Sequence, residues 1–218
     1  MNSPLIQLLV LAGIAIFLIL RLKSVLGSRE GFEKPSAPEK AVKKSRKGFE
    51  VIEGGPDRDI TDHVPENDEA AQQLAAMKRV EPEFSVTEFV QGARGAYEMI
   101  VMGFERGNID DLIPFLAEDV YDAFAQVVEA REEQGLQIES EFVGVRETSI
   151  ADVRFDKDSG RAEITMRFVG ELTSVVRDRG GDIIEGSAST VKRQKDTWTF
   201  ARIMGTDDPN WRLVATDA

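Results

Sequence analysis

The hydrophobic pattern of the chain changes several times, and the first segment is the most apolar. Residues 1–20 carry no charged side chain, and residues 5–20 are almost wholly aliphatic. Twenty residues of α-helix rise about 30 Å, which is the thickness of a bilayer hydrocarbon core. The pattern predicts a transmembrane anchor over residues 1–26. A cleaved signal peptide is the alternative, but no Lys or Arg precedes the run and residues 21–27 make a poor cleavage site.

Helical periodicity begins near residue 68. Asp68 is followed by an amphipathic stretch that predicts a short helix over residues 67–80. Ser85 and Glu88 then form a capping box, the usual start of a helix. Apolar residues recur at helical spacing from there until Gly107, a natural helix stop. The pattern therefore predicts two helices in this region.

A further helix is expected before the pattern changes again. Asn108 is placed as the next N-cap, because Asp110 and Asp111 behind it would complement the helix dipole. An amphipathic stripe then predicts a helix over residues 118–133, with Gly135 as its stop. A metal site at the two acids is the weaker alternative, since the dipole explains both.

After residue 135 apolar and polar residues alternate with a period of two, which is typical of half-buried strands. The alternation is clearest at residues 153–155, 162–168 and 197–200. Turn-forming clusters separate these runs at residues 156–160, 179–182 and 194–196. About three helices followed by about four strands predict an α+β fold, with the helices on one face of a curved, four-stranded antiparallel sheet. We expect this domain to cover residues 81–218.

The distribution of charge along the chain changes at about the same places as the hydrophobic pattern. The chain has 27 Lys and Arg against 39 Asp and Glu, a net charge of −12. Residues 21–50 contain nine Lys or Arg and four Glu, whereas residues 51–218 carry a net charge of −17. Residues 27–66 show no sustained periodicity and are rich in Pro and Gly, so they are predicted to form a basic, disordered linker.

The basic linker is the predicted membrane-surface element. Each Lys or Arg near anionic lipid contributes about 1 kcal/mol, although a solvated tether is the alternative. The residues expected at the lipid surface are Lys40, Lys43, Lys44, Arg46 and Lys47. Positive charge follows the anchor and none precedes it, which places the N-terminus outside and the body in the cytoplasm. The helix over residues 67–80 is expected to help hold the acidic body near the membrane.

The residue types present exclude several chemistries. The chain has no Cys and one His, so it lacks thiol nucleophiles, disulfides, Cys-bound metals and multi-His sites. An acidic chain is also a poor nucleic-acid binder. Asp156 and Asp158 are interpreted as a hairpin turn, because a calcium loop would need Glu where Arg167 stands. His63 is interpreted as solvated. We predict no catalytic residue, no metal site and no cofactor.

A curved sheet wrapped by helices forms a cone that can hold an apolar ligand. The large side chains expected to line it are Tyr97, Phe104, Phe115, Phe124, Met166, Phe168 and Phe200. The sequence leaves open whether these residues fill the cone or leave a pocket. Trp211 follows a turn at residues 207–210 and either packs back on the domain or contacts a partner.

The order and spacing of many residues in the predicted domain can be compared with those of a known family. They are Phe84, Phe89, Gly92, Ala93, Tyr97, Ile100, Phe104, Gly107, Asn108, Leu112, Pro114, Phe115, Leu116, Val120, Tyr121, Phe124, Arg131, Gly135, Trp198, Thr199, Phe200, Arg202, Asp208, Pro209, Asn210, Trp211 and Leu213. Their order resembles the import inner membrane translocase subunit 44-like domain, over about residues 80–218. The anchor and Lys-rich linker resemble the bacterial members. The resemblance implies a nuclear transport factor 2-like cone and no catalysis.

The resemblance also implies a function. Mitochondrial members tether a matrix heat-shock chaperone of seventy kilodaltons to the import channel and contact cardiolipin-containing membrane. We therefore expect a non-enzymatic adaptor at the cytoplasmic face of a bacterial inner membrane. Its expected partners are a heat-shock chaperone or a translocation component, and inner-membrane lipid such as cardiolipin. The alternatives are an apolar-ligand-binding or isomerase-type enzyme on the same cone, which needs a buried acid or base, and an envelope scaffold with its body in the periplasm.

Overall fold

The computed structural model describes residues 57–217. The predicted anchor over residues 1–26 and most of the predicted linker lie outside the described residues. The five predicted membrane-surface residues lie outside them too: Lys40, Lys43, Lys44, Arg46 and Lys47. Within residues 57–217 no helix is both long enough and apolar enough to cross a membrane.

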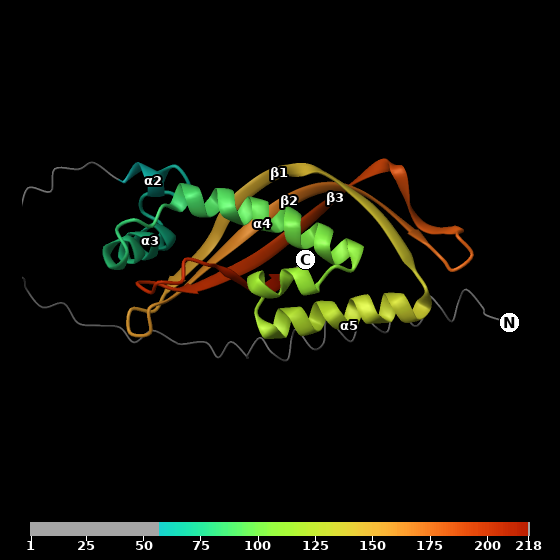
Figure 1. The fold of residues 1–218 in the computed structure, drawn as a ribbon. Coiled ribbons are helices and arrows are strands. Elements are labelled where there is room, and N and C mark those ends of the chain that lie inside the picture. The colour runs from blue at the N-terminus through green and yellow to red at the C-terminus, as the bar shows by residue number, and fades with distance from the viewer. Residues whose placement is uncertain (1–56, 218) are drawn as a thin grey trace, which may run out of the picture. The chain divides into compact units, whose positions relative to one another are not determined.

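Three helices come first in the described chain, and two of them begin where the sequence predicts. They are α2 (Arg58–Thr61), α3 (Glu69–Val80) and α4 (Val86–Arg106), shown in Figure 1. The Asp68 side chain accepts the Ala70 N–H and caps α3, while Ser85 accepts the Glu88 N–H at 3.2 Å and caps α4. Gly107 ends α4 in the left-handed conformation, with φ at +76°. These caps confirm the predicted helix starts and the predicted stop.

The helix α2 lies inside the stretch that was predicted as linker, so the predicted end of the linker is wrong. Asp57 caps it by accepting the Asp59 N–H at 3.0 Å. Ile60 and Val64 are buried, with 5% of each exposed. A helix of four residues is too short to produce a periodic pattern, which is why the sequence did not reveal it.

Two more helical segments follow α4. They are η1, a 3₁₀ helix (Asp110–Phe115), and α5 (Glu118–Gln134). The predicted cap at Asn108 is wrong, because η1 begins after Ile109 and no side chain caps it. The Asn108 N–H instead donates to the Gly103 carbonyl at 2.8 Å, which closes the C-terminus of α4. This bond and the left-handed glycine together form a Schellman motif.

The rest of the chain forms one antiparallel sheet in the order β1-β2-β3-β4. Its strands are β1 (Gln137–Phe155), β2 (Arg161–Arg177), β3 (Ile183–Ile203) and β4 (Arg212–Asp217). Three register shifts interrupt the pairing of β1 with β2, and Figure 1 shows the long strands arching past α4. Bulges of this kind bend and twist a sheet. The predicted α+β fold with a four-stranded antiparallel sheet is confirmed.

Two of the three predicted turns are confirmed and one is wrong. The β1–β2 and β2–β3 hairpins close at residues 156–160 and 178–182. The third cluster, residues 194–196, lies inside β3, where Gln194 pairs with Gly170 and Asp196 with Phe168. Polar runs usually mark turns, but here Asp196 is buried and bonded to α4. A long-range contact therefore overrides the local pattern.

The core lies between the helices and the inner face of the sheet. Tyr97 and Ile100 of α4 are fully buried, and so are Leu74 and Met77 of α3. Because α3 packs its apolar face inward, the folded body includes α2 and α3 as well as the region after Glu81.

Candidate functional site

An aromatic cluster on the inner face of the sheet surrounds Tyr97. The Tyr97 ring stacks on Phe168 with 4.5 Å between centroids, and lies 4.7 Å from Trp198 and 6.2 Å from Phe142. At Gly170 a β-carbon would lie 2.6 Å from the Tyr97 hydroxyl oxygen, so only glycine leaves room for the phenol. Aromatic pairs at such distances add about 1 kcal/mol beyond the area they bury. The cluster fills the space between α4, β2 and β3.

A buried carboxylate faces this cluster. The Tyr97 hydroxyl donates to Asp196 at 2.5 Å, and the Gln194 side-chain amide donates to the same carboxylate at 3.1 Å. Asp196 is 7% exposed and is the one buried charged residue among residues 57–217. Burial, and then the bond to Asp196, raise the pKa of Tyr97 far above its ordinary value of 10. Tyr97 therefore stays a neutral hydrogen-bond donor.

Asp196 is the functional candidate that the sequence interpretation missed. The period of two offered a signal, because Asp196 falls in phase with Trp198 and Phe200 on the inner face. A buried Tyr–Asp pair is also what an isomerase-type enzyme on this fold would need. Tyr97, however, has no exposed surface, and the rings of Phe168 and Trp198 pack against it. The Tyr97 hydroxyl and the Asp196 carboxylate are therefore both largely withdrawn from solvent.

The structure also has an open pocket of about 740 Å³, and it lies at the other end of the sheet. Its walls come from α2, α3 and the β1–β2 turn, with Ile60, Ala75 and Phe155 among the apolar members. The charged members are Arg79 and Lys157 together with the acidic residues Asp57, Glu66, Asp156 and Asp158. The pocket touches neither Tyr97 nor Asp196, nor any of the seven residues predicted to line a pocket.

Those seven residues fall into three sets. Four are buried together in the main core: Tyr97, Met166, Phe168 and Phe200. Phe104 and Phe124 pack on each other between α4 and α5, with 4.7 Å between centroids. Phe115 is partly buried against the main core.

A polar cluster lies beside the second set. The Arg131 guanidinium lies 4.3 Å from the centre of the Phe104 ring and donates to the Phe104 carbonyl at 3.3 Å. Burial lowers the pKa of Arg131, and Glu105 opposes this effect. Ser140 and Ser174 donate to Glu105 at 2.5 and 3.2 Å. These contacts join the C-terminal end of α4 to α5, β1 and β2.

Trp211, the predicted partner contact, packs back on the body. Its ring centroid lies 4.7 Å from Phe89 and 6.0 Å from Phe84. The Arg202 guanidinium lies 5.5 Å from the same ring. A partner could therefore contact only the half-exposed part of Trp211.

An ion pair lies next to Trp211. Arg202 donates to the Glu81 carboxylate, and the Gly205 N–H donates to the same oxygen at 3.1 Å. The Arg202 side chain is 7% exposed and that of Glu81 is 26% exposed. Burial tends to raise the pKa of Glu81, but the bonds from Arg202 and Gly205 outweigh it and hold the pKa below its ordinary value. The pair fixes the segment between α3 and α4 to the end of β3.

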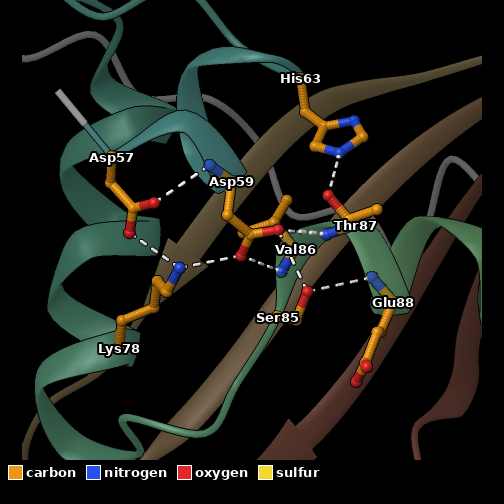
Figure 2. Close-up of polar contacts among 8 residues, drawn as sticks. All are labelled: Asp57, Asp59, His63, Lys78, Ser85, Val86, Thr87 and Glu88. Carbon is orange, nitrogen blue, oxygen red and sulfur yellow. Dashed lines mark hydrogen bonds and ion pairs between the residues drawn. The ribbon is translucent and has the colours of Figure 1, made fainter.

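A second cluster joins the three N-terminal helices, as Figure 2 shows. Asp59 of α2 accepts the Val86 and Thr87 N–H groups at 2.7 and 2.9 Å, which are free donors in the first turn of α4. It also accepts the Ser85 hydroxyl at 3.1 Å and the Lys78 ammonium of α3 at 2.8 Å. The Asp59 carboxylate therefore links α2 to both α3 and α4.

Neighbouring residues complete this cluster. Lys78 also binds Asp57 at 2.7 Å. Burial tends to lower the pKa of Lys78, but the bonds to Asp57 and Asp59 outweigh it and raise the pKa. His63 was predicted to be solvated, and that prediction is wrong: its Nε2 lies 3.0 Å from the Thr87 hydroxyl, and the ring is half-buried. The contact exists because α2 places residue 63 against the start of α4.

Removing the Asp59 carboxylate should loosen the three helices. We expect Asp59→Ala to lower the free energy of unfolding by about 2 kcal/mol, the upper range for a lost helix cap. The control is Asp62→Ala, because Asp62 is exposed and its side chain has no hydrogen bond among the described residues. Urea denaturation of both variants would measure the difference. Equal stability of the two would contradict the proposed cap.

The same carboxylate should make stability depend on pH. Burial tends to raise the pKa of Asp59, but the bonds from Lys78 and the two backbone amides outweigh it and hold the pKa well below 3.8. A carboxyl group with a depressed folded pKa contributes stability above its unfolded pKa, and this is lost as pH falls below that value. Unfolding midpoints measured from about pH 5 down to about pH 2 should therefore fall less steeply in Asp59→Asn than in the native chain.

Apolar side chains are also exposed on the β2–β3 hairpin. Ile183 is 54% exposed, while Ile184 and Val191 are each 49% exposed. Figure 1 shows this hairpin extending beyond the end of α4. Exposed apolar groups of this kind are typical of surfaces that bind other molecules.

Comparison with known proteins identifies the family of this chain. A family model, that of the Tim44-like domain, matches residues 70–218. The mitochondrial import inner membrane translocase subunit TIM44 from Homo sapiens is 25% identical over 153 residues, which make up 69% of this chain and 33% of TIM44. The chain thus spans about a third of the length of that relative. A crystal structure of the intermembrane space region of the chloroplast protein ARC6 aligns with a TM-score of 0.41 and 12% identity, covering 59% of this chain and 94% of that one.

Proposed function

The chain belongs to the Tim44-like domain family, and we propose that it is a membrane-anchored, non-enzymatic adaptor in protein translocation. The observation that supports this most is the filled inner face of the sheet. Packed rings surround Tyr97, and its partner Asp196 is buried, so this Tyr–Asp pair lies inside the body. The outer surface of the body is therefore the part that is available for binding, which suits an adaptor better than an enzyme.

The fold proposal goes with this function. We assign the body to the nuclear transport factor 2-like cones, in which helices lie inside a curved sheet. The arch of β1 and β2 past α4 supports the assignment (Figure 1). So does the packing of Tyr97 on both β2 and β3.

The proposed arrangement in the cell follows from the sequence. Residues 1–26 cross the inner membrane of a bacterium once, with the N-terminus outside and the body in the cytoplasm. The partner is a protein, with a heat-shock chaperone or a translocation component as the candidates. Treating spheroplasts with protease tests the topology: a body that resists digestion from outside supports it, and digestion would place the body in the periplasm.

The adaptor role can be tested by photo-crosslinking in native membranes. A crosslinking amino acid would replace an exposed apolar residue on a different part of the body in each variant: Ile113, Val143 or Ile184. Mass spectrometry should then recover a chaperone or a translocation component from at least one position. Recovery of lipid alone from every position would contradict the adaptor role.

We assign lipid attraction to the linker rather than to α3. Leu74 and Met77 of α3 are fully buried, so its apolar face is already used by the core. The body is acidic as well, and anionic lipid should repel it. The attraction must then come from the linker residues Lys40, Lys43, Lys44, Arg46 and Lys47.

Replacing those five residues with Gln should weaken binding to anionic liposomes by roughly a thousandfold or more, because five charges at about 1 kcal/mol each amount to about 5 kcal/mol. The chain used for this test begins at Arg29 and so lacks the anchor. Binding of the unchanged chain should also weaken as salt rises, because salt screens surface charge. The matched control replaces five exposed basic residues of the body: Arg106, Arg154, Lys157, Arg167 and Arg212. A chain beginning at Glu81 is unsuitable, because it lacks Leu74 and Met77. Liposome flotation measures each chain, and an equal loss in the control would contradict the assignment.

A further inference from the structure

Within residues 57–217, part of β3 has a strand paired with it on one side only. β4 pairs with β3 only at residues 197–201, although β3 begins at Ile183. Residues 192–195 pair with β2 on one side, and no described strand pairs with them on the other. Alternate residues of such an edge point their N–H and C=O groups outward. These backbone groups are able to pair with an added strand.

The existing contacts of β4 define where an added strand would lie. β4 runs antiparallel to β3 and ends beside Thr197, so a strand continuing its line would lie along residues 192–195. On its other side, β4 contacts the segment just before α5, because the Ala117 N–H donates to the Leu213 carbonyl at 2.8 Å. At the far end, the Arg179 side chain donates to the Glu133 carbonyl of α5. These two contacts fix one end of α5 beside β4 and the other end beside the β2–β3 hairpin.

The open edge is basic, in contrast to the acidic body. Lys192, Arg193 and Lys195 are all exposed. Arg193 binds Glu171 at 3.1 Å and Lys192 binds Glu185 at 3.3 Å. Lys195 forms no ion pair within residues 57–217.

The side chains of this edge divide between two faces. Gln194 donates to Asp196, which bonds to Tyr97, so both lie on the inner face. Because alternate residues face opposite sides, Arg193 and Lys195 lie on the outer face. By the same alternation Lys192 shares the inner face with Gln194. An incoming strand would therefore meet two cations on its outer face, and one cation and an amide on its inner face.

The charge also decides which strand fits. If two copies of the chain paired through this edge, they would place basic residues opposite basic residues, and Lys on an edge opposes such pairing. An acidic segment would face opposite charges instead. We propose that residues 192–195 of β3 bind an extended acidic segment of the partner protein, added antiparallel to β3 and in line with β4. This inference rests on the proposed adaptor function, since it names the kind of partner segment that the adaptor binds.

A binding experiment can test strand addition directly. The probe is a fluorescent eight-residue peptide in which Glu alternates with Val, added to the full chain in lipid nanodiscs. Fluorescence anisotropy should detect binding, and hydrogen exchange at residues 192–195 should slow in the complex. A second peptide of the same sequence carries N-methyl groups on alternate amides, so it keeps the charge but cannot pair as a strand. Binding of both peptides with equal affinity would overturn the proposal, and so would failure of the first to bind.

Matched charge reversals test the position. Lys195→Glu should weaken binding of the first peptide at least tenfold. Lys157→Glu changes the net charge equally, in the exposed β1–β2 turn at the other end of the sheet, and should change binding less than twofold. An equal loss of peptide binding in both variants would mean that net charge alone causes the effect, and it would overturn the proposal. Circular dichroism of both variants verifies that the body stays folded.

Crosslinking in native membranes separates this inference from the adaptor function. If Ile184 or another surface position recovers a protein partner and Lys195→Glu does not reduce the yield, the edge proposal fails and the adaptor function stands. If no position recovers a protein, the adaptor function fails. Loss of the partner in Lys195→Glu but not in Lys157→Glu supports both.

Discussion

Replacing Glu81 with Ala should lower the free energy of unfolding by about 3 kcal/mol. The change leaves the Arg202 guanidinium, whose side chain is 7% exposed, without its carboxylate. It also removes the acceptor of the Gly205 N–H. Arg202 would keep its bond to the Pro209 carbonyl at 3.3 Å but no countercharge. A buried charge without a countercharge is strongly destabilising, because its lost hydration is not compensated. Guanidinium denaturation followed by circular dichroism measures the change.

The control for this prediction lies two residues away. Glu83 is exposed and makes no hydrogen bond or ion pair with a described residue, so Glu83→Ala should change stability by less than about 0.5 kcal/mol. A second variant combines Glu81→Ala with Arg202→Met, which removes both charges together. We expect it to be more stable than Glu81→Ala alone, since an apolar replacement of both partners avoids an unpaired charge. If Glu81→Ala were as stable as Glu83→Ala, the ion pair would not hold the α3–α4 segment to β3.

The parts of the fold that the sequence predicts correctly are those determined by neighbouring residues. Asp68 and Ser85 bond to amides two and three residues away, so their identity alone indicates a helix start. Gly107 and Gly135 both adopt the left-handed conformation that ends a helix. The alternation in β2 is also local, since its residues alternate between the core and the outer face.

The features that the sequence did not predict depend on residues far away in the chain. Asp196 belongs to a polar run typical of a turn, and only its bond to Tyr97, 99 residues away, explains why it is buried in β3. Asp59 caps a helix that begins 27 residues later, so no local motif contains both partners. His63 is half-buried for the same reason, through Thr87. Local patterns cannot reveal such contacts, because the fold brings the partners together.

The residues of the candidate site show the same division, between features that the sequence predicts and features that depend on how the chain folds. Composition identified the large apolar residues that face the sheet, and Met166, Phe168 and Phe200 are indeed in the core. Whether they enclosed a pocket depended on how α4 packs, which hydrophobicity does not determine. Tyr97 fills that space only because Gly170 lacks a β-carbon. The close fit of the Tyr97 hydroxyl against β2 thus depends on a glycine at position 170.

Tyr97→Phe should lower the free energy of unfolding by about 3 kcal/mol, because it removes the hydroxyl donor from a buried carboxylate while keeping the ring. Asp196→Leu removes the acceptor, and a double-mutant cycle isolates their interaction. We expect the double variant to be more stable than the sum of the two single changes implies, since neither polar group then lacks its partner. Denaturation of all four chains measures this coupling. A coupling near zero would mean that the bond does not stabilise the fold, and it would contradict the role of the Tyr97–Asp196 bond in holding α4 to β3.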